Sequence, residues 1–210
     1  MSHMAANWAF AEQYVNEPSA VTAARERAFE LGCPVIGAST GGALRLLAAA
    51  TQAKTAVEVG TGTAVASLWL LYGMPTDGVL TTIDPEREHH RAAKTAFHHA
   101  EISSHRTRAI TGHPHDVLPR LADNAYDLFV LSSGALGAIE VCHEAYRLLR
   151  PGGVAVFTHA FVSGRLSDPA NRDENTVSLR QWYRDLGDSP QWTPSILPVG
   201  DGLLCLVRGN

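Results

Sequence analysis

Two carboxylates follow short apolar segments at positions where they could bind a ligand. Glu58 precedes the glycines of the stretch VEVGTGTAVAS, and Asp84 closes the stretch VLTTID. Gly60, Thr61 and Gly62 would let the backbone turn sharply and let a ligand approach it closely. Asp84 lies further on by about 20 residues, the usual distance of a carboxylate that accepts hydrogen bonds from ribose hydroxyls. The pair favours a nucleoside ligand over an ordinary tight turn, which is the structural alternative.

The charge of Glu58 helps to select the kind of nucleoside. A carboxylate beside the loop would repel a pyrophosphate, and Val65 stands where a dinucleotide-binding loop has its third glycine. The same negative charge would attract an ammonium or sulfonium group. The loop therefore predicts a positively charged derivative of adenosine.

Small hydroxyl side chains follow a third apolar segment. The stretch AYDLFVLSSG passes through four apolar residues to Ser132 and Ser133. Ligands of a parallel sheet sit beyond the carboxyl ends of its strands, so these hydroxyls are expected at the binding edge. They can form hydrogen bonds there, but they bring no negative charge.

These residues depend on strands that alternate with helices. Helices are expected over 18–32 and 40–53, and the alternation begins at Lys54. It predicts an α/β fold with a Rossmann-like, doubly wound sheet of seven strands, right-handed crossovers and extra N-terminal helices. Two final apolar segments around GDG indicate a hairpin, which makes the last strand antiparallel. The expected strands cover 54–60, 79–84, 106–112, 126–132, 151–159, 192–199 and 202–208.

The composition indicates one globular domain over residues 1–210. It is 45% hydrophobic and 18% charged, and its net charge of −4 does not favour nucleic acid as a partner. No apolar run is long enough to span a membrane, and no signal peptide is visible. Residues 1–4, MSHM, resemble the remnant of an expression tag, and 5–53 form the N-terminal helices. The three cysteines are widely separated, which predicts reduced thiols and a cytoplasmic location.

Several motifs in order give the chain a resemblance to a known family. EVGTGT, LTTID, DVLPRL, YDLFV and LRPGGV together resemble the S-adenosylmethionine-dependent O-methyltransferases of the catechol and caffeoyl-CoA type, O-methyltransferase family 3. The resemblance runs from about residue 20 to the end. It implies S-adenosyl-L-methionine as cofactor, a small-molecule methyl acceptor and a homodimer.

The resemblance also implies roles for residues of the expected binding edge. Glu58 would hold the methionine end of the cofactor, and Asp84 would bind its ribose. Gly60, Thr61 and Gly62 would let it pass over the loop. His113 and Pro114 would flank the adenine, and Ser132 would contact cofactor and acceptor.

Other positions depart from the pattern of the metal-dependent members. Where those members have an aspartate, this chain has Ser132, and where they have Asp-Asn it has Thr158 and His159. The position of their catalytic lysine falls at about Ala135. Magnesium prefers anionic and other oxygen ligands, and all the anionic ones are replaced. We therefore expect no divalent metal. The loop also has Ala64 and Ala66 where glycine and serine are usual.

Two functions remain open at this point. The first is O-methyl transfer without metal to a small hydroxylated, aromatic acceptor, with His159 as general base and Ser132 as a hydrogen-bonding partner. The second is a non-catalytic protein that binds S-adenosylmethionine or S-adenosylhomocysteine. A lone histidine at a strand end is also often a hydrogen-bonded structural residue, so His159 has a second interpretation.

Four further histidines, His89, His90, His98 and His99, fall on one expected helix. Pairs of histidines at this spacing could bind zinc or nickel. A solvated helix face is preferred, because no cysteine or acid completes a tetrahedral set.

Overall fold

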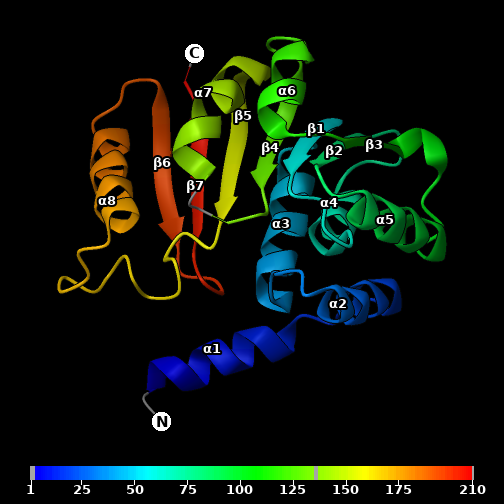
Figure 1. Ribbon diagram of the computed structural model, residues 1–210, viewed down its shortest axis with the longest axis horizontal. Coiled ribbons are helices and arrows are strands. Elements are labelled where there is room, and N and C mark those ends of the chain that lie inside the picture. Colours follow the sequence, from blue (N-terminus) through cyan, green and yellow to red (C-terminus); the bar gives the residue numbers. More distant parts are fainter. Residues whose placement is uncertain (1–2, 135–136, 210) are drawn as a thin grey trace.

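The computed structural model describes residues 3–134 and 137–209, and all their strands form one sheet. Figure 1 shows the sheet with helices on both sides and the N-terminal helix apart from it. The strands are β1 (Thr55–Val59), β2 (Val79–Asp84), β3 (Thr107–Thr111), β4 (Tyr126–Leu131), β5 (Leu149–Thr158), β6 (Trp192–Leu197) and β7 (Leu203–Arg208). The helices are α1 (His3–Tyr14), α2 (Ser19–Leu31), α3 (Ala38–Ala50), α4 (Val65–Gly73), α5 (Arg87–His99), α6 (Pro114–Val117), α7 (Ala138–Leu148) and α8 (Glu174–Gly187), with short 3₁₀ turns at Ser104–Arg106 and Leu118–Arg120.

The sheet has seven strands in the order β3-β2-β1-β4-β5-β7-β6. The strands from β1 to β5 pair in parallel, whereas β7 runs antiparallel to both β5 and β6. The Rossmann-like sheet and its antiparallel last strand are thus confirmed. Because the strand order reverses between β1 and β4, the carboxyl ends of these strands border the crevice where ligands bind in such folds.

Two hydrophobic cores cover the two faces of the sheet. One contains buried residues of α2, α3, α4 and α5, and the other contains those of α6, α7 and α8. The central strands are buried on both faces, which explains why β4 ends in a continuous apolar run, LFVL, rather than an alternating one.

The N-terminal helices pack on one side of the sheet. Helix α2 begins after Pro18 and ends at Gly32, whose φ of 68° gives the left-handed cap expected of a helix ending in glycine. Helix α3 packs against α4 at Gly41, where an added Cβ would come within 2.1 Å of the Trp69 ring nitrogen. Helix α1 contacts α3 and lies farther from the sheet (Figure 1). In the described part of the chain, no helix is long and apolar enough to cross a membrane.

Candidate active site

The loop between β1 and α4 brings main chain close to the end of β4. Gly60 has a φ of +94°, and an added Cβ there would lie 2.7 Å from Ser133 Cβ and 2.8 Å from Ser133 N. Only glycine fits both the backbone angle and the space. Gly62 also has a positive φ, and Ala64 adopts the left-handed conformation immediately before α4. The loop is thus tightly turned, as the sequence predicted, although one of its left-handed positions is an alanine.

Glu58 lies beneath this loop and is completely buried. Its Oε2 accepts hydrogen bonds from the hydroxyls of Ser67 and of Thr82 (2.8 Å), and its Oε1 accepts one from Ser132 Oγ (2.7 Å). Burial raises the pKa of Glu58 to about 7, and the three hydroxyls oppose this shift. Hydrogen bonds connect the carboxylate to the loop through Thr82, whose hydroxyl lies 2.6 Å from Thr61 Oγ1, and to the end of β4 through Ser132. A direct contact of Glu58 with the methionine end of a cofactor stays a prediction.

Asp84 ends β2 and faces the glycine loop. Its Oδ2 accepts a hydrogen bond from Gly62 N (2.9 Å), and its Oδ1 accepts from Glu86 N (2.9 Å) and contacts His89 Nδ1 (3.0 Å). The side chain is 8% exposed. The two parts of the chain that the sequence paired, the loop and Asp84, are therefore in direct contact at the carboxyl edge.

Most of the other predicted cofactor residues line two hollows at the same edge, but His113 lines neither of them, and His115 lines the larger one instead. A crevice of about 20 Å³ lies over the loop, and a larger hollow of about 370 Å³ lies beside the end of β4. Thr61 and Ser132 line the crevice, and Pro114 lines the larger hollow with Val59 and Leu131. His113 precedes α6 and stacks on His115, with ring centroids 5.3 Å apart. The larger hollow has apolar walls from Val59, Leu118 and Leu131, with Glu140 and Glu144 also in its lining. Apolar walls with a few polar groups are usual for sites that bind small molecules.

His159 follows β5 at the other end of this edge. It has a φ of +54°, an unusual conformation for a residue other than glycine. Its Nδ1 lies 3.5 Å from Asp201 Oδ2, and its buried Nε2 has no hydrogen-bond partner among the described residues. Asp201 is itself fixed, because it accepts two hydrogen bonds from Ser163 N. A histidine with one nitrogen beside a carboxylate can act as a general base, provided that a substrate reaches the buried Nε2.

The side chains at the metal positions of the related family do not fit a divalent cation. Ser132 Oγ donates to Glu58, and Thr158 Oγ1 is buried and donates to Leu131 O (3.1 Å). His159 offers one neutral nitrogen, and no carboxylate takes the place of the missing aspartate. Magnesium requires several oxygen ligands, of which carboxylates are the strongest. Ala135, at the position of the family lysine, lies outside the described residues.

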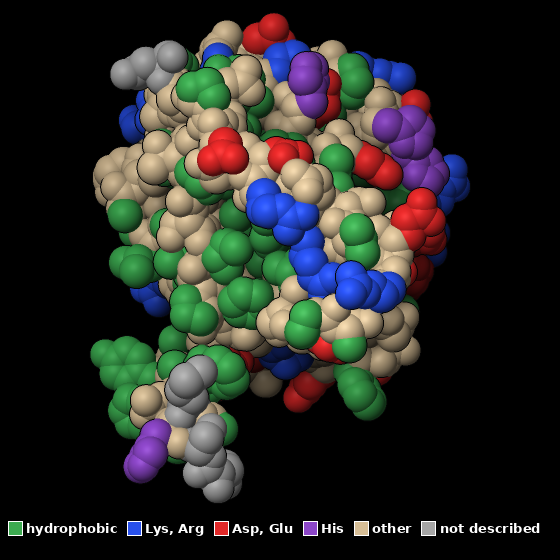
Figure 2. Space-filling view, turned by 90° about the vertical axis from the view of Figure 1, so that its left-hand side faces the viewer, with side chains coloured by type: hydrophobic (Ala, Val, Ile, Leu, Met, Phe, Trp, Pro, Cys, Tyr) green, Lys and Arg blue, Asp and Glu red, His purple; other side chains and the backbone are tan. Residues whose placement is uncertain are grey.

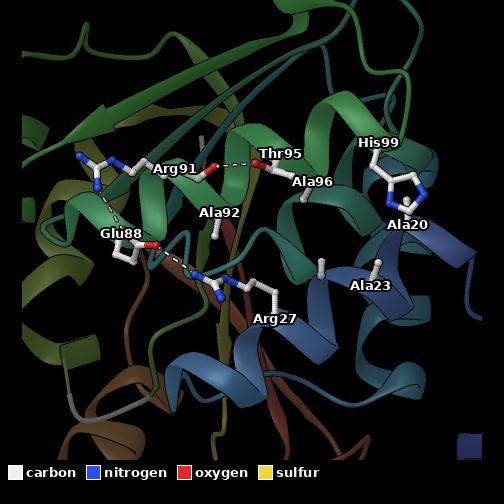
Figure 3. A pocket seen from close by; sticks show the side chains of 10 residues that line it. Ala20, Ala23, Arg27, Glu88, Arg91, Ala92, Thr95, Ala96 and His99 are labelled. Carbon is white, nitrogen blue, oxygen red and sulfur yellow. Dashed lines mark hydrogen bonds and ion pairs between the residues drawn. The ribbon is translucent and has the colours of Figure 1, made fainter.

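A further hollow, of about 360 Å³, lies between α2 and α5, away from the strand ends (Figure 3). Its walls carry alanine side chains of both helices. Arg27 bonds Glu88 (3.0 Å), and Arg91 bonds the same carboxylate (3.3 Å). We do not assign a ligand to this groove, because these charges are paired with one another.

Several residues of the site were not singled out by the sequence. Ser67 and Thr82 lie on α4 and β2, where hydroxyls are common and give no distinct signal. Asp201 lies in the GDG turn, which was interpreted only as a hairpin. The expectation that His89 lies on a solvated helix face is wrong, because its ring contacts Asp84 and lies 2.8 Å from Cys33 Sγ.

Comparisons with known proteins identify the family of the chain. The sequence model of the O-methyltransferase family matches residues 10–209. A Mycobacterium sp. (strain JLS) protein named "Putative O-methyltransferase" is 46% identical over 200 residues, which are 95% of this chain and 91% of the relative.

Solved structures give the same result. TomG, an O-methyltransferase of Streptomyces achromogenes involved in tomaymycin synthesis, was solved in complex with S-adenosylmethionine. It is 25% identical, with a TM-score of 0.86 and full coverage of both chains. A Corynebacterium glutamicum protein is 30% identical, with a TM-score of 0.87, covering 96% of this chain and 94% of its own. The chain therefore belongs to the O-methyltransferase family, the S-adenosylmethionine-dependent family that its sequence motifs resemble.

Proposed function

We propose that the protein transfers a methyl group from S-adenosylmethionine to a hydroxyl of a small aromatic acceptor, without a divalent metal. The observation that carries the proposal is the state of His159. This histidine sits at the binding edge with Nε2 unpartnered among the described residues and with Nδ1 next to Asp201. Family membership supports the cofactor and the class of reaction.

The cofactor would lie across the ends of β1, β2 and β4. Asp84 would accept hydrogen bonds from the ribose, and Gly60, Thr61 and Gly62 would let the ligand rest on the main chain. Pro114 would border the adenine in the larger hollow, and His113 would support it by stacking on His115, which lines the same hollow. Ser132, held by Glu58, would lie near the methionine end, because it lines the crevice over the loop.

Methyl transfer would then need only alignment and a base. The acceptor hydroxyl gives its proton to His159 Nε2, and its oxygen attacks the methyl carbon in line with the C–S bond. That bond breaks toward sulfur, which leaves S-adenosylhomocysteine and a methyl ether. For Nε2 to accept a proton, Nδ1 must carry one, and the neighbouring Asp201 carboxylate favours that tautomer. Alignment supplies much of the remaining acceleration.

A second candidate is a protein of this family that binds the cofactor without catalysis. Ser132 and Thr158 support it, because the carboxylate that would hold a metal-bound acceptor is missing from both positions. Such a protein would keep the Asp84 site and leave His159 as a structural residue.

We also propose that this one-domain enzyme works as a cytoplasmic homodimer, with no nucleic acid or membrane partner. Trp8, Phe10 and Tyr14 on α1 are exposed. Figure 2 shows hydrophobic side chains on the projecting N-terminal helix and over the face above it. Exposed apolar patches of this kind often mark protein–protein contacts. Sedimentation of the wild type and of Trp8→Ser with Phe10→Ser would test the dimer, since the substituted chain is expected to be monomeric.

Calorimetric titration with S-adenosylmethionine, with and without magnesium, tests the proposal first. We expect binding of equal strength in both conditions. A screen of phenolic acceptors with S-adenosylmethionine labelled in the methyl group then separates the two candidates, because only an enzyme produces labelled ether. Turnover that requires magnesium would contradict the metal-free mechanism, and a complete lack of binding would exclude both candidates.

A further inference from the structure

The ribose-type carboxylate is already surrounded by donors of the protein itself. Gly62 N and Glu86 N donate to Asp84 Oδ2 and Oδ1, and His89 Nδ1 contacts Oδ1 at 3.0 Å. An ionised carboxylate has about four lone-pair sites, two on each oxygen. Both lone-pair sites of Oδ1 are therefore occupied, and Oδ2 has one free lone-pair site.

A ribose with two free hydroxyls needs more than this single site. Its two neighbouring hydroxyls donate best when each meets a different oxygen of the carboxylate. Oδ2 can accept one of them, but Oδ1 must first lose a donor. Ligand binding through both hydroxyls thus requires one of the present contacts to break.

His89 is the donor that can leave. Gly62 N and Glu86 N belong to main chain fixed by the β1–α4 loop and by the start of α5. The imidazole of His89 is a side chain at the surface end of the site, with 24% of it exposed. Rotation of one side chain frees Oδ1 without moving either loop.

Cys33 holds the imidazole in this position from the other side. Its Sγ lies 2.8 Å from His89 Nε2. Burial raises the pKa of the Cys33 thiol, so the thiol keeps its proton and donates it to Nε2. Nδ1 then carries the hydrogen that faces Asp84. A salt bridge between Arg27 on α2 and Glu88 on α5 (Figure 3) also links the helix that precedes Cys33 to the helix that carries His89.

We propose that His89, anchored by Cys33, is a built-in competitor that occupies the place of a ribose hydroxyl on Asp84 and is displaced when the cofactor binds. The inference rests on the proposed function, because it assumes that Asp84 receives the ribose of S-adenosylmethionine. It also gives the N-terminal segment a role, since Pro34, Val35 and Ile36, which follow Cys33, line the crevice over the loop.

Removal of the competitor should strengthen cofactor binding. We expect His89→Ala to bind S-adenosylhomocysteine about tenfold more tightly than the wild type in calorimetry, which is the worth of one hydrogen bond to a charged group. His98→Ala is the matched control, because His98 lies exposed on the same helix, and its affinity should not change. Cys33→Ala, which frees the ring but leaves it in place, should give a gain of about twofold.

A ligand with one ribose hydroxyl separates competition from a general structural effect. The 2′-deoxy form of S-adenosylhomocysteine needs a single acceptor site, which Oδ2 already offers. The gain of His89→Ala should therefore disappear with this ligand. His89→Asn places an amide donor near the position of Nδ1, and its affinity for S-adenosylhomocysteine should stay close to that of the wild type.

The outcomes distinguish this inference from the proposed function. Equal or weaker binding of S-adenosylhomocysteine by His89→Ala, or an equal gain with the 2′-deoxy ligand, would overturn the competitor role while leaving the cofactor assignment intact. If neither the wild type nor His89→Ala binds the ligand, the proposed function itself fails. Thermal unfolding of each variant checks that a change in affinity does not come from a loss of fold.

Discussion

The two ends of the binding edge are built in opposite ways. At the ends of β1 and β2, the carboxylates of Glu58 and Asp84 each accept three hydrogen-bonding contacts from the protein. At the end of β5, by contrast, His159 keeps a buried nitrogen without a partner in the described structure. A satisfied buried group stabilises a fixed shape, whereas an orphaned one costs free energy unless a ligand meets it. Under the proposed function, the first end would hold the cofactor and the second would supply the base.

Removal of the base should give the largest effect and would test the reactive end directly. We expect His159→Gln to lower kcat by about 10²–10⁴-fold, the usual contribution of a positioned acid or base, with the affinity for S-adenosylmethionine unchanged. Steady-state kinetics and calorimetry measure the two quantities. His143→Gln, at a histidine whose side chain is 87% exposed, is the control. An unchanged kcat in His159→Gln would show that His159 is not the base, so the two ends of the edge would not differ in the proposed way.

Loss of the Asp84 carboxylate, the proposed ribose ligand, should weaken cofactor binding and leave the His159 end of the site unchanged. Asp84→Ala is expected to weaken binding of S-adenosylmethionine by at least about 100-fold, because hydrogen bonds to a charged group are each worth ~1.5–3 kcal/mol. Asp77→Ala removes an exposed aspartate just before β2 and should bind normally. Calorimetric affinity that survives the loss of Asp84 would show that the nucleoside sits elsewhere.

The pH dependence of stability tests whether Glu58 is buried as the structure shows. Burial raises its pKa from 4.5 to about 7, so between these values the folded protein holds a proton that the unfolded chain has released. Stability from this group is therefore present at low pH and is lost as the pH rises through 7, by on the order of 3 kcal/mol. Glu58→Gln should flatten this slope in urea unfolding at pH 5 and pH 8. Glu26→Gln, at an exposed glutamate, should keep it.

The glycine loop gives the smallest predicted effect, and the chain supplies its own control. Gly60→Ala combines a φ of +94° with an approach of 2.7 Å to Ser133 Cβ, so it should destabilise the fold by about 2–3 kcal/mol. Gly62→Ala has a φ of +51° and no atom within 4 Å, so about 1 kcal/mol is expected. Urea unfolding measures both. If both variants lost the same free energy of unfolding, the close approach of Gly60 to Ser133 would not contribute to the cost of the substitution.

Sequence reasoning predicted the contact between Asp84 and the glycine loop, because the rules of parallel sheets govern it. The carboxyl ends of neighbouring parallel strands must meet, so the amino-acid pattern alone was enough to place Asp84 beside the glycine loop. Glu58 was placed correctly on β1, but its complete burial under Ser67, Thr82 and Ser132 depends on tertiary packing.

Contacts between distant elements were not predictable in the same way. Asp201 reaches His159 because β7 pairs with β5 in a register that sets Leu203 opposite Thr158, and the sequence does not fix an antiparallel register. Cys33 meets His89 because a loop after α2 passes the start of α5. Helical periodicity shows that His89 lies on a helix, but it says nothing about which loop crosses it.

The position of β7 has a consequence for the order in which the protein is completed. This strand is the last of the seven in the chain, yet it lies between β5 and β6. Until β7 is synthesised, β5 is an open edge strand of the sheet. Among the described strands, β6 pairs only with β7, so it has no partner before then. The GDG turn that brings Asp201 to His159 is set only when β7 docks. A nascent chain can thus pair β1 to β5 early, but the contact between His159 and Asp201 forms only after β7 has been synthesised.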